Sequence, residues 1–467
     1  MSLSTQFETR SPTIKSGDTI LLRLPNENAK NIKIEKDCTV SLGRVGSFFA
    51  NELIGQPYGR TYDIVNKKLT LLPPRTLAEV GQLHPISVES LLNPRIVEDT
   101  DATNELINDG QFVQPLTLDE IQALKQAGTH ASEIIKMQIE QHANYSLKTE
   151  YSKEKYKKRK EAKYSKTFTT IEPTLFNVCE FWFNKDKDRI RDIRVDTLSQ
   201  ILNMANIRPG GRFLAVDDAS GLIVSGIIER MGGSGRLITI GNTESPPAYP
   251  VMATMNFNDA AVSPILSCLN WSTADQSHTP LVPPVDVPPD QMKSDRQKSR
   301  LNKRKAALDL LNRNREDLFA GEFDSLIIAS EYEPYSILER LVQYVAFSGS
   351  IVIHSPYSSV LAEVQTKLRA LPQYLGPSVT EVWLRRYQVL PGRTHPTMNT
   401  SGAGGFILHT IKVNDDESAN AITAFRRPKP AVSKSATPVN GAGTSSAPTP
   451  IVVAEDDAME DVVQSSS

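Results

Sequence analysis

Five residues, Asp217 to Gly221, lie where a nucleotide-binding sheet holds its ligand. They follow a short apolar run, Phe213 to Val216, which has the length of a buried strand. Aliphatic residues at near-helical spacing, Leu222 to Ile228, come directly after them. In such a strand–loop–helix unit, loop glycines let the backbone approach a bound nucleotide closely. The stretch therefore predicts the opening of a doubly wound α/β sheet, and the alternative is a βαβ sheet that binds no ligand.

The loop resembles the first motif of S-adenosylmethionine-dependent methyltransferases in its layout, but its residue types differ. Those enzymes place an acid inside the strand and glycines at three alternate loop positions. Here the acidic place falls on Ala215, and the glycine places fall on Asp217, Ala219 and Gly221. A carboxylate at position 217 would repel the carboxylate of the methionine moiety. The resemblance implies the fold, and the substitutions predict that this chain binds no cofactor.

A second candidate binding region is the basic run from Lys148 to Lys166, which contains nine basic and three acidic residues. Its centre, Lys153 to Tyr164, carries charge almost all round a predicted helix, so such a helix buries little. Lysine and arginine release counterions when they bind phosphate, and the tyrosines offer stacking or 2′-hydroxyl contacts. The candidate RNA-binding residues here are Lys155, Lys157, Lys158, Arg159, Lys160 and Lys163. A solvated helix and a nuclear import signal are the alternatives.

The elements that position these residues divide the chain into predicted domains. Short strands separated by glycines predict a small β-barrel over residues 14–76. Residues 77–170 are predicted to form a helical linker with the basic helix, and a capping box, Thr117 with Glu120, begins one of its helices. Residues 171–414 are predicted to form the α/β domain, with a flexible insertion at about 272–305. The ends, 1–13 and the acidic tail 415–467, are predicted to be disordered.

Charge is unevenly distributed along the chain. Eight acidic and four basic residues lie from Asp415 onward, so with a net charge of −2 the preceding part carries about +2. Such segregation is typical of nucleic-acid binding, and a further basic run, Lys293 to Lys305, has seven basic residues and one acidic residue. The three cysteines and seven histidines have no metal-ligand spacing, so no metal site is predicted. The polar N-terminus and the lack of a long apolar run predict a soluble intracellular protein with no membrane contact.

Five segments, in chain order, resemble one family closely. They are GSFFANELIGQPYG, QPLTLDEIQALKQAG, KTEYSKEKYKKRKEAKY, RFLAVDDASGL and LPGRTHPTMNTSGAGGFIL. The family is that of the non-catalytic subunits of the eukaryotic tRNA (adenine(58)-N(1))-methyltransferase. The resemblance implies a barrel, a degenerate Rossmann-like methyltransferase domain, and a heterotetramer with two copies of a catalytic paralogue. It also implies that the paralogue holds S-adenosylmethionine and methylates N1 of a T-loop adenosine in the nucleus, with initiator tRNA among the substrates.

Two further places bear on catalysis. The acid that binds the cofactor ribose in such enzymes falls near Gly241, with Glu244 three residues on as a substitute. The place of the paralogue's catalytic aspartate, at the end of the strand FDSLIIA, falls on Ala329. Asp324 lies at the far end of that strand, about 16 Å away at strand rise, and Glu331 is the nearby acid. The chain is therefore predicted to be non-catalytic. The alternatives are an active S-adenosylmethionine-dependent RNA methyltransferase and an RNA-binding scaffold of a translation-initiation assembly.

The last candidate is Arg393, in LPGRTHPTMNTSGAGGF. Pro391-Gly392 predicts a turn and Pro396 stops strand pairing, so Arg393 is expected in a loop between the last two strands of the sheet. Arginine binds phosphate through two donors and also stacks on bases. We expect Arg393 to contact tRNA in trans, near the partner's active site, where the backbone must be held while an adenosine is extracted. A surface ion pair or a loop brace is the alternative.

Overall fold

The computed structural model describes residues 11–73, 116–126, 129, 131–142, 145, 150–243, 247–279, 295–390, 393–399 and 402–415. All of them belong to one compact unit, Met1–Asp415. The predicted acidic tail, apart from Asp415, lies outside the described residues, and so do residues 1–10 of the predicted disordered N-terminus. Within the described ranges, no helix has the length and apolarity needed to cross a membrane.

A seven-stranded sheet forms the framework of the predicted α/β domain. Its strands are β8 (Arg212–Asp217), β9 (Arg236–Gly241), β10 (Leu266–Asn270), β11 (Phe323–Ala329), β12 (Val345–Ser355), β13 (Tyr374–Glu381) and β16 (Phe406–Lys412). They lie in the order β10-β9-β8-β11-β12-β16-β13. Neighbours from β10 to β12 are parallel, whereas β16 is antiparallel to both β12 and β13. Because strands are added first on one side of β8 and then on the other, the predicted doubly wound sheet is confirmed.

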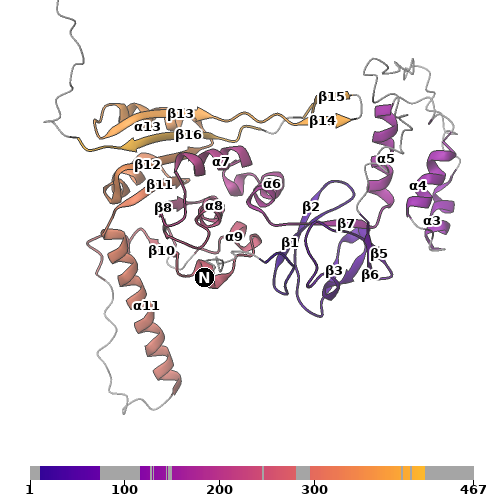
Figure 1. Ribbon diagram of the computed structural model, residues 1–467, viewed down its shortest axis with the longest axis horizontal. Coiled ribbons are helices and arrows are strands. Elements are labelled where there is room, and N and C mark those ends of the chain that lie inside the picture. The colour runs from indigo at the N-terminus through magenta and orange to yellow at the C-terminus, as the bar shows by residue number, and fades with distance from the viewer. Residues whose placement is uncertain are drawn as a thin grey trace, which may run out of the picture. The chain divides into compact units, whose positions relative to one another are not determined.

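Helices cover both faces of this sheet (Figure 1). One face carries α6 (Leu175–Lys185), α7 (Val195–Met204), α8 (Leu222–Met231), α9 (Pro250–Thr254) and α10 (Asp259–Val262), and the other carries α11 (Asp295–Phe319), α12 (Pro334–Leu341) and α13 (Ser358–Arg369). Side chains alternate along a strand, so Phe213 and Ala215 of β8 join the first core, and Leu214 and Val216 join the second. Burial on both faces accounts for the unbroken apolar run that predicts β8.

The N-terminal part contains two antiparallel sheets. The larger has the order β2-β1-β7-β5-β6, with β1 (Thr19–Arg23), β2 (Ala29–Lys33), β5 (Thr61–Val65), β6 (Lys68–Leu72) and β7 (Thr167–Ile171). The smaller pairs β3 (Thr39–Ser41) with β4 (Ser47–Phe49). The predicted short strands are present, but closure into a barrel is not confirmed, because the described strands of the larger sheet end at β2 and β6.

Strand β7 corrects the predicted boundary between the N-terminal domain and the linker. It pairs with both β1 and β5 at the centre of the larger sheet, although it follows the linker helices in the chain. Phe168 of β7 is buried and stacks on Phe48 and Tyr62, with ring centroids 5.0 and 5.7 Å away. The N-terminal domain is therefore built from residues near 14–72 together with 167–171, and the predicted linker 77–170 ends inside one of its strands.

The described part of the linker is helical, as predicted. It contains α3 (Leu118–Gln126), α4 (Ala131–Glu140) and the basic helix α5 (Glu150–Tyr164). The capping box is confirmed, because Thr117 N donates to Glu120 Oε2 at 2.9 Å and Glu120 N donates to Thr117 Oγ1 at 3.3 Å. A small apolar core, with Ile121, Ile134 and Tyr164 among its buried members, packs these helices together.

Two predictions about the C-terminal half are wrong. Residues 295–305 of the predicted flexible insertion are helical, because they begin α11, whose lysine, arginine, alanine and leucine content favours a helix. Residues 272–279 form turns, and 280–294 lie outside the described residues. Arg393 is not in a loop but in a strand, because β15 (Arg393–Pro396) pairs with β14 (Tyr387–Leu390) in a separate hairpin. Pro396 is tolerated there at the end of an edge strand.

Candidate functional site

The loop between β8 and α8 has the backbone of a tight strand-to-helix turn. Asp217 is the last residue of β8, and Gly221 precedes the first helical residue with φ 84° and ψ 16°. Ser220 also has a positive φ of 59°, and its hydroxyl donates to the Arg189 carbonyl at 3.0 Å. Of the three places where a glycine is expected, only position 221 has one, and its left-handed backbone favours glycine there.

Asp217 points its carboxylate into its own loop. Oδ1 accepts from Ala219 N at 2.8 Å, and Oδ2 accepts from Val224 N at 2.9 Å. Burial raises the pKa of Asp217 to about 6, although the hydrogen bonds from the backbone of Val224, Ala219 and Gly221 act in the opposite direction. One backbone N–H of the loop and one of the first turn of α8 are therefore already satisfied by the protein's own carboxylate.

The ring of Tyr249 covers the glycine. A Cβ added at Gly221 would lie 2.6 Å from Tyr249 Cβ and 2.7 Å from its Cγ. Tyr249 is buried, and its backbone is left-handed with φ 41°. Burial raises the pKa of Tyr249 far above its usual range, so the hydroxyl stays protonated.

These contacts test whether the loop fits S-adenosylmethionine, and it does not. A ligand that approaches the Gly221 backbone collides with Tyr249, since even an added Cβ would lie only 2.8 Å from its Cδ1. A ligand carboxylate that seeks the N–H groups of Ala219 and Val224 meets the Asp217 carboxylate instead, and like charges repel. Tyr249 lies 28 positions beyond the glycine, so the motif alone does not reveal its part in filling the loop.

A second loop carboxylate, that of Asp218, ties β8 to the end of β11. Its Oδ2 accepts from Ser330 Oγ at 2.6 Å and from Glu331 N at 3.1 Å, and Asp218 N donates to the Ala329 carbonyl at 3.0 Å. The structure places Ala329, where the paralogue's catalytic aspartate is expected, as the buried last residue of β11. Hydrogen bonds within the protein therefore hold the loop after β8 against the C-terminal end of β11.

Asp324 begins β11 at the opposite end, as the sequence predicts. Its Oδ1 accepts from Arg208 Nη2 at 2.6 Å, and its Oδ2 accepts from Arg212 N at 2.8 Å. This acid therefore fixes the entry to β8 and lies at the wrong end of the strand for chemistry at the loop. Gly241 ends β9, and the next residue, Asn242, donates from Nδ2 to Tyr332 Oη at 3.1 Å. Glu244, the predicted substitute acid, lies outside the described residues.

The basic helix α5 has a packed side and an exposed side. Tyr164 is buried, and Tyr156 packs against the rings of His142 and Tyr145, with centroids 5.0 and 5.9 Å away. Lys160 is half-buried, with Nζ 5.0 Å from the centroid of the Tyr156 ring, and this burial lowers the pKa of Lys160. The expectation that these tyrosines are offered to RNA is therefore wrong for Tyr164, which belongs to the core.

The exposed side of α5 presents one row of cations, which we call the α5 stripe: Lys155, Arg159 and Lys163. The three residues are four positions apart, so they lie above one another on one face of the helix. Lys157 is half-buried, and Lys158 is part of the same helix. Of the predicted set, the structure therefore places Lys155, Arg159 and Lys163 in an exposed row and half-buries Lys157 and Lys160.

Arg393 and the basic helix belong to separate elements. The Arg393 backbone pairs with Leu390 at the start of β15, and His395 pairs with Gln388. Exposed apolar side chains accompany this hairpin: Trp383 is 80% exposed, Tyr387 58% and Met398 86%.

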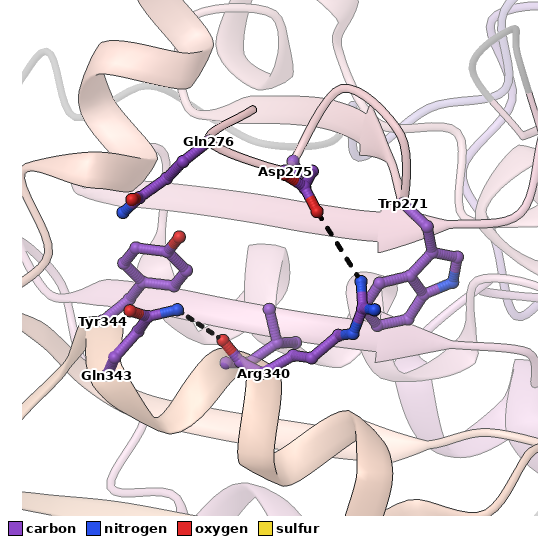
Figure 2. A pocket seen from close by; sticks show the side chains of 8 residues that line it. Trp271, Asp275, Gln276, Arg340, Gln343 and Tyr344 are labelled. Atoms are coloured by element: carbon purple, nitrogen blue, oxygen red, sulfur yellow. Dashed lines mark hydrogen bonds and ion pairs between the residues drawn. The ribbon is translucent and has the colours of Figure 1, made fainter. Parts of the chain in front are cut away.

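Two of the cavities in the described part of the α/β domain can be compared with the loop. The first, about 240 Å³, lies on the α11–α12 side of the sheet and is lined by Trp271, Asp275, Arg340 and Tyr344, among others (Figure 2). Arg340 Nη1 lies 3.9 Å from Asp275 Oδ2 across it. The second, about 260 Å³, is lined by residues of α6 and by Arg194 and Arg386. Neither of these two cavities is lined by Asp217, Ala219 or Gly221.

Together, the sheet order and the β8–α8 loop define a methyltransferase-like domain whose cofactor loop is filled by its own side chains. The Gcd10p family model matches residues 13–306, and the chain belongs to this family.

Its relatives agree with this assignment. The chain is 31% identical to a Dictyostelium discoideum protein over 439 residues, which cover 88% of this chain and 81% of that one. It is 27% identical to a Debaryomyces hansenii protein (88% and 89% covered) and 26% identical to a Mus musculus protein (86% and 89% covered). Each of the three is named a tRNA (adenine(58)-N(1))-methyltransferase non-catalytic subunit. The predicted resemblance is therefore confirmed.

Solved structures also show similarity. A SAM-dependent O-methyltransferase from Thermotoga maritima has a TM-score of 0.46 at 13% identity, covering 87% of this chain and 97% of that one. A tRNA (m1A58) methyltransferase from Aquifex aeolicus has a TM-score of 0.43 at 12% identity, covering 86% and 99%.

Proposed function

We propose that this chain is the tRNA-binding, non-catalytic subunit of the complex that methylates N1 of adenosine 58 in the tRNA T-loop. In this proposal a catalytic paralogue holds S-adenosylmethionine, and this chain binds and positions the tRNA. The observation that carries the proposal is the filled β8–α8 loop, in which Asp217 accepts the loop's N–H donors and Tyr249 covers Gly221. A subunit that cannot hold the methyl donor contributes to the reaction through assembly and substrate binding.

The RNA-binding part of the proposal is supported by the α5 stripe. Lys155, Arg159 and Lys163 are exposed on one face, while the other face of the helix is fixed by Tyr164 and Tyr156. A row of cations on an anchored helix provides a preformed contact for the phosphates of one RNA strand. A solvated helix without a ligand would not need such an anchor.

The partner is proposed to be the catalytic paralogue, with two copies of each subunit in the complex. The name that the relatives share, non-catalytic subunit, is the support for a catalytic partner. The exposed Trp383, Tyr387 and Met398 are proposed to cover part of the contact, because apolar groups of this size are usually buried in an assembly. We place the complex in the nucleus and include initiator tRNA among its substrates.

Arg393 is proposed to act in trans on the tRNA held by the paralogue. The β14–β15 hairpin pairs only within itself among the described strands, so it is available to reach another subunit. A guanidinium near the partner's active site would hold the displaced RNA backbone while the adenosine is flipped out. Thr394 and His395 lie in the same strand and fix the position of the arginine backbone.

Two alternatives to the proposal are an active methyltransferase and a scaffold of a translation-initiation assembly. An active methyltransferase requires the loop to admit S-adenosylmethionine, which Asp217 and Tyr249 oppose. A pure scaffold of a translation-initiation assembly requires no role in modification, so its depletion would leave tRNA methylation unchanged.

The test is reconstitution. The chain is co-purified with its partner, the partner is identified by mass, and methyl transfer to a tRNA transcript is measured for each subunit alone and for the two together. Activity only in the combined sample supports the proposal. Activity of this chain alone would establish it as an enzyme, and full activity of the partner alone would reduce this chain to a scaffold.

A further inference from the structure

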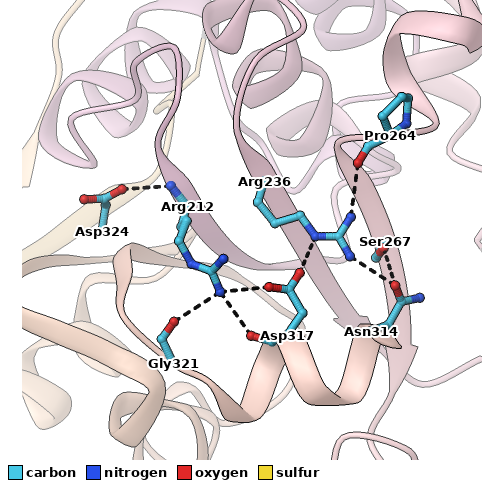
Figure 3. Close-up of polar contacts among 8 residues, drawn as sticks. All are labelled: Arg212, Arg236, Pro264, Ser267, Asn314, Asp317, Gly321 and Asp324. Atoms are coloured by element: carbon cyan, nitrogen blue, oxygen red, sulfur yellow. Dashed lines mark hydrogen bonds and ion pairs between the residues drawn. The ribbon is translucent and has the colours of Figure 1, made fainter. Parts of the chain in front are cut away.

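Helix α11 consists of two halves with different surroundings. Its C-terminal half is fixed to the N-terminal ends of strands in the seven-stranded sheet by a network of hydrogen bonds and ion pairs (Figure 3). Asp317 Oδ1 accepts from Arg212 Nη2 at 2.9 Å, and its Oδ2 accepts from Arg236 Nε. Asn314 Oδ1 accepts from Arg236 Nη2 at 3.0 Å and from Ser267 Oγ at 2.8 Å. These contacts join α11 to the first residues of β8 and β9 and to Ser267 of β10.

The anchor is ionic and partly buried. Burial opposes ionisation of Asp317, but hydrogen bonds from Arg236 and Arg212, together with their charges, lower the pKa of this carboxyl overall. Arg315 adds two bonds to the backbone of the preceding turn, from Nη1 to Thr273 O at 2.6 Å and from Nη2 to His278 O at 3.0 Å. The direction of the whole helix is therefore set by its last two turns.

The N-terminal half, Asp295–Lys305, projects from this anchor (Figure 1). It is about 16 Å long at helical rise. It carries six basic residues and one acidic residue. One row of it, which we call the α11 stripe, consists of Arg296, Arg300 and Arg304, and all three are exposed.

Two neighbours in the α11 stripe, Arg300 and Arg304, are electrostatically unfavourable to each other. Arginines four positions apart are neighbours on a helix, and like charges at this spacing repel. Within the described part of the chain, neither Arg300 nor Arg304 is in an ion pair with a carboxylate. Lys298 and Lys303 beside them are also exposed. A polyanion laid along the row would remove this repulsion.

We propose that the α11 stripe is a second RNA-binding surface, distinct from the α5 stripe, that contacts the phosphates of the RNA backbone. The three guanidiniums recur every ~6 Å along a rigid axis. Each presents a planar fork that binds phosphate oxygens through two donors. The α5 stripe has the same spacing of four, so two anchored helices present the same row of three exposed cations. The choice of RNA as the polyanion rests on the proposed function.

The test uses the complex with its catalytic partner and an unmodified tRNA transcript as the probe. Arg296, Arg300 and Arg304 are changed together to alanine, which preserves helix propensity. Each lost phosphate contact lowers the slope of log affinity against log salt by roughly 0.7–0.9, so we expect a loss of about 2–3 in slope. A triple lysine variant should keep most of the slope, since it keeps the charge. A triple alanine control at exposed Lys15, Lys36 and Lys68 should leave the slope unchanged.

The outcomes separate this inference from the proposed function. An unchanged slope in the α11 variant, with a reduced slope in an α5 stripe variant, would overturn the α11 surface and leave the proposed function standing. Absence of tRNA binding by the wild-type complex would overturn both. If the wild-type complex binds phosphatidylserine vesicles, the α11 variant does not, and tRNA affinity is equal in the two, the surface is a membrane contact and the inference is wrong.

Discussion

The buried carboxylate of Asp217 predicts an unusual pH dependence of stability. Its pKa is raised from the usual 3.8 to about 6 in the folded chain. Between these values the folded chain binds more protons than the unfolded chain, so the free energy of unfolding falls as pH rises. One pKa unit corresponds to about 1.4 kcal/mol, so this one group lowers the free energy of unfolding by about 3 kcal/mol in all. About 2 kcal/mol of this loss falls between pH 4 and 7, because the unfolded carboxyl is already more than half ionised at pH 4.

Asp217→Asn isolates this effect. Asparagine does not titrate, so the free energy of unfolding of the wild type minus that of the variant should fall by about 2 kcal/mol from pH 4 to 7. The variant should also be less stable by about 1–3 kcal/mol at every pH, because the N–H group of either Ala219 or Val224 loses its acceptor. Urea unfolding of the full chain at several pH values measures both terms.

A matched control is Asp259→Asn, at an exposed aspartate in the first turn of α10. It should leave the pH dependence of the wild type in place. If Asp217→Asn and the wild type showed the same dependence on pH, the carboxylate would be solvated. The loop would then be open, contrary to the burial and hydrogen bonds described above.

Three further predictions concern the loop, the basic helix and the hairpin. Gly221→Ala should destabilise the chain by about 2–5 kcal/mol in urea unfolding, because a left-handed backbone and a collision with Tyr249 add together. Replacing the α5 stripe, Lys155, Arg159 and Lys163, by alanine should lower the salt slope of tRNA binding by about 2–3. Raising salt from 50 to 200 mM should then weaken wild-type binding about 15- to 60-fold more than binding of the variant. Arg393→Ala should slow single-turnover methylation by about 10- to 1,000-fold, with assembly and tRNA affinity nearly intact.

Each of these has a control in the same chain. Gly232→Ala has a positive φ of 60° but no atom within 4 Å of the added Cβ, so it should show the backbone cost alone. Equal losses for the two glycine variants would mean that Tyr249 does not fill the loop. Exposed Lys15, Lys36 and Lys68, changed together to alanine, control the stripe, and an unchanged stripe slope would leave α5 as a solvated helix or import signal.

For Arg393 the control is Arg369→Ala, at an exposed arginine of α13. It should leave the methylation rate unchanged. A wild-type rate in Arg393→Ala would make that residue a surface group without a role in the reaction. Dissociation of the complex would instead make it a structural brace of the interface.

The sequence predicted the features that local patterns determine. The apolar run before Asp217 predicted the central strand, because a strand buried on both faces has no polar alternation. Thr117 and Glu120 predicted the start of α3, because a capping box is completed within one turn. The position of Asp324 at the far end of β11 followed from strand geometry alone.

The features that it did not predict depend on contacts through space. Tyr249 reaches Gly221 from a later segment, and no local pattern near either residue indicates that contact. Strand β7 has two partners that lie more than 90 residues earlier in the chain. The α11 helix looks like a solvated basic run until Asp317 and Asn314 are seen to fix it to the sheet. The family resemblance, in contrast, needed only the order of five segments.

The central claim is that this chain has a methyltransferase-like domain with a filled cofactor loop. The most direct measurement is calorimetric titration of S-adenosylmethionine into the purified full chain, whose folding is checked by its assembly with the catalytic partner. We expect no saturable binding at micromolar cofactor, because Asp217 and Tyr249 occupy the loop. Saturable micromolar binding to the chain alone would contradict the claim.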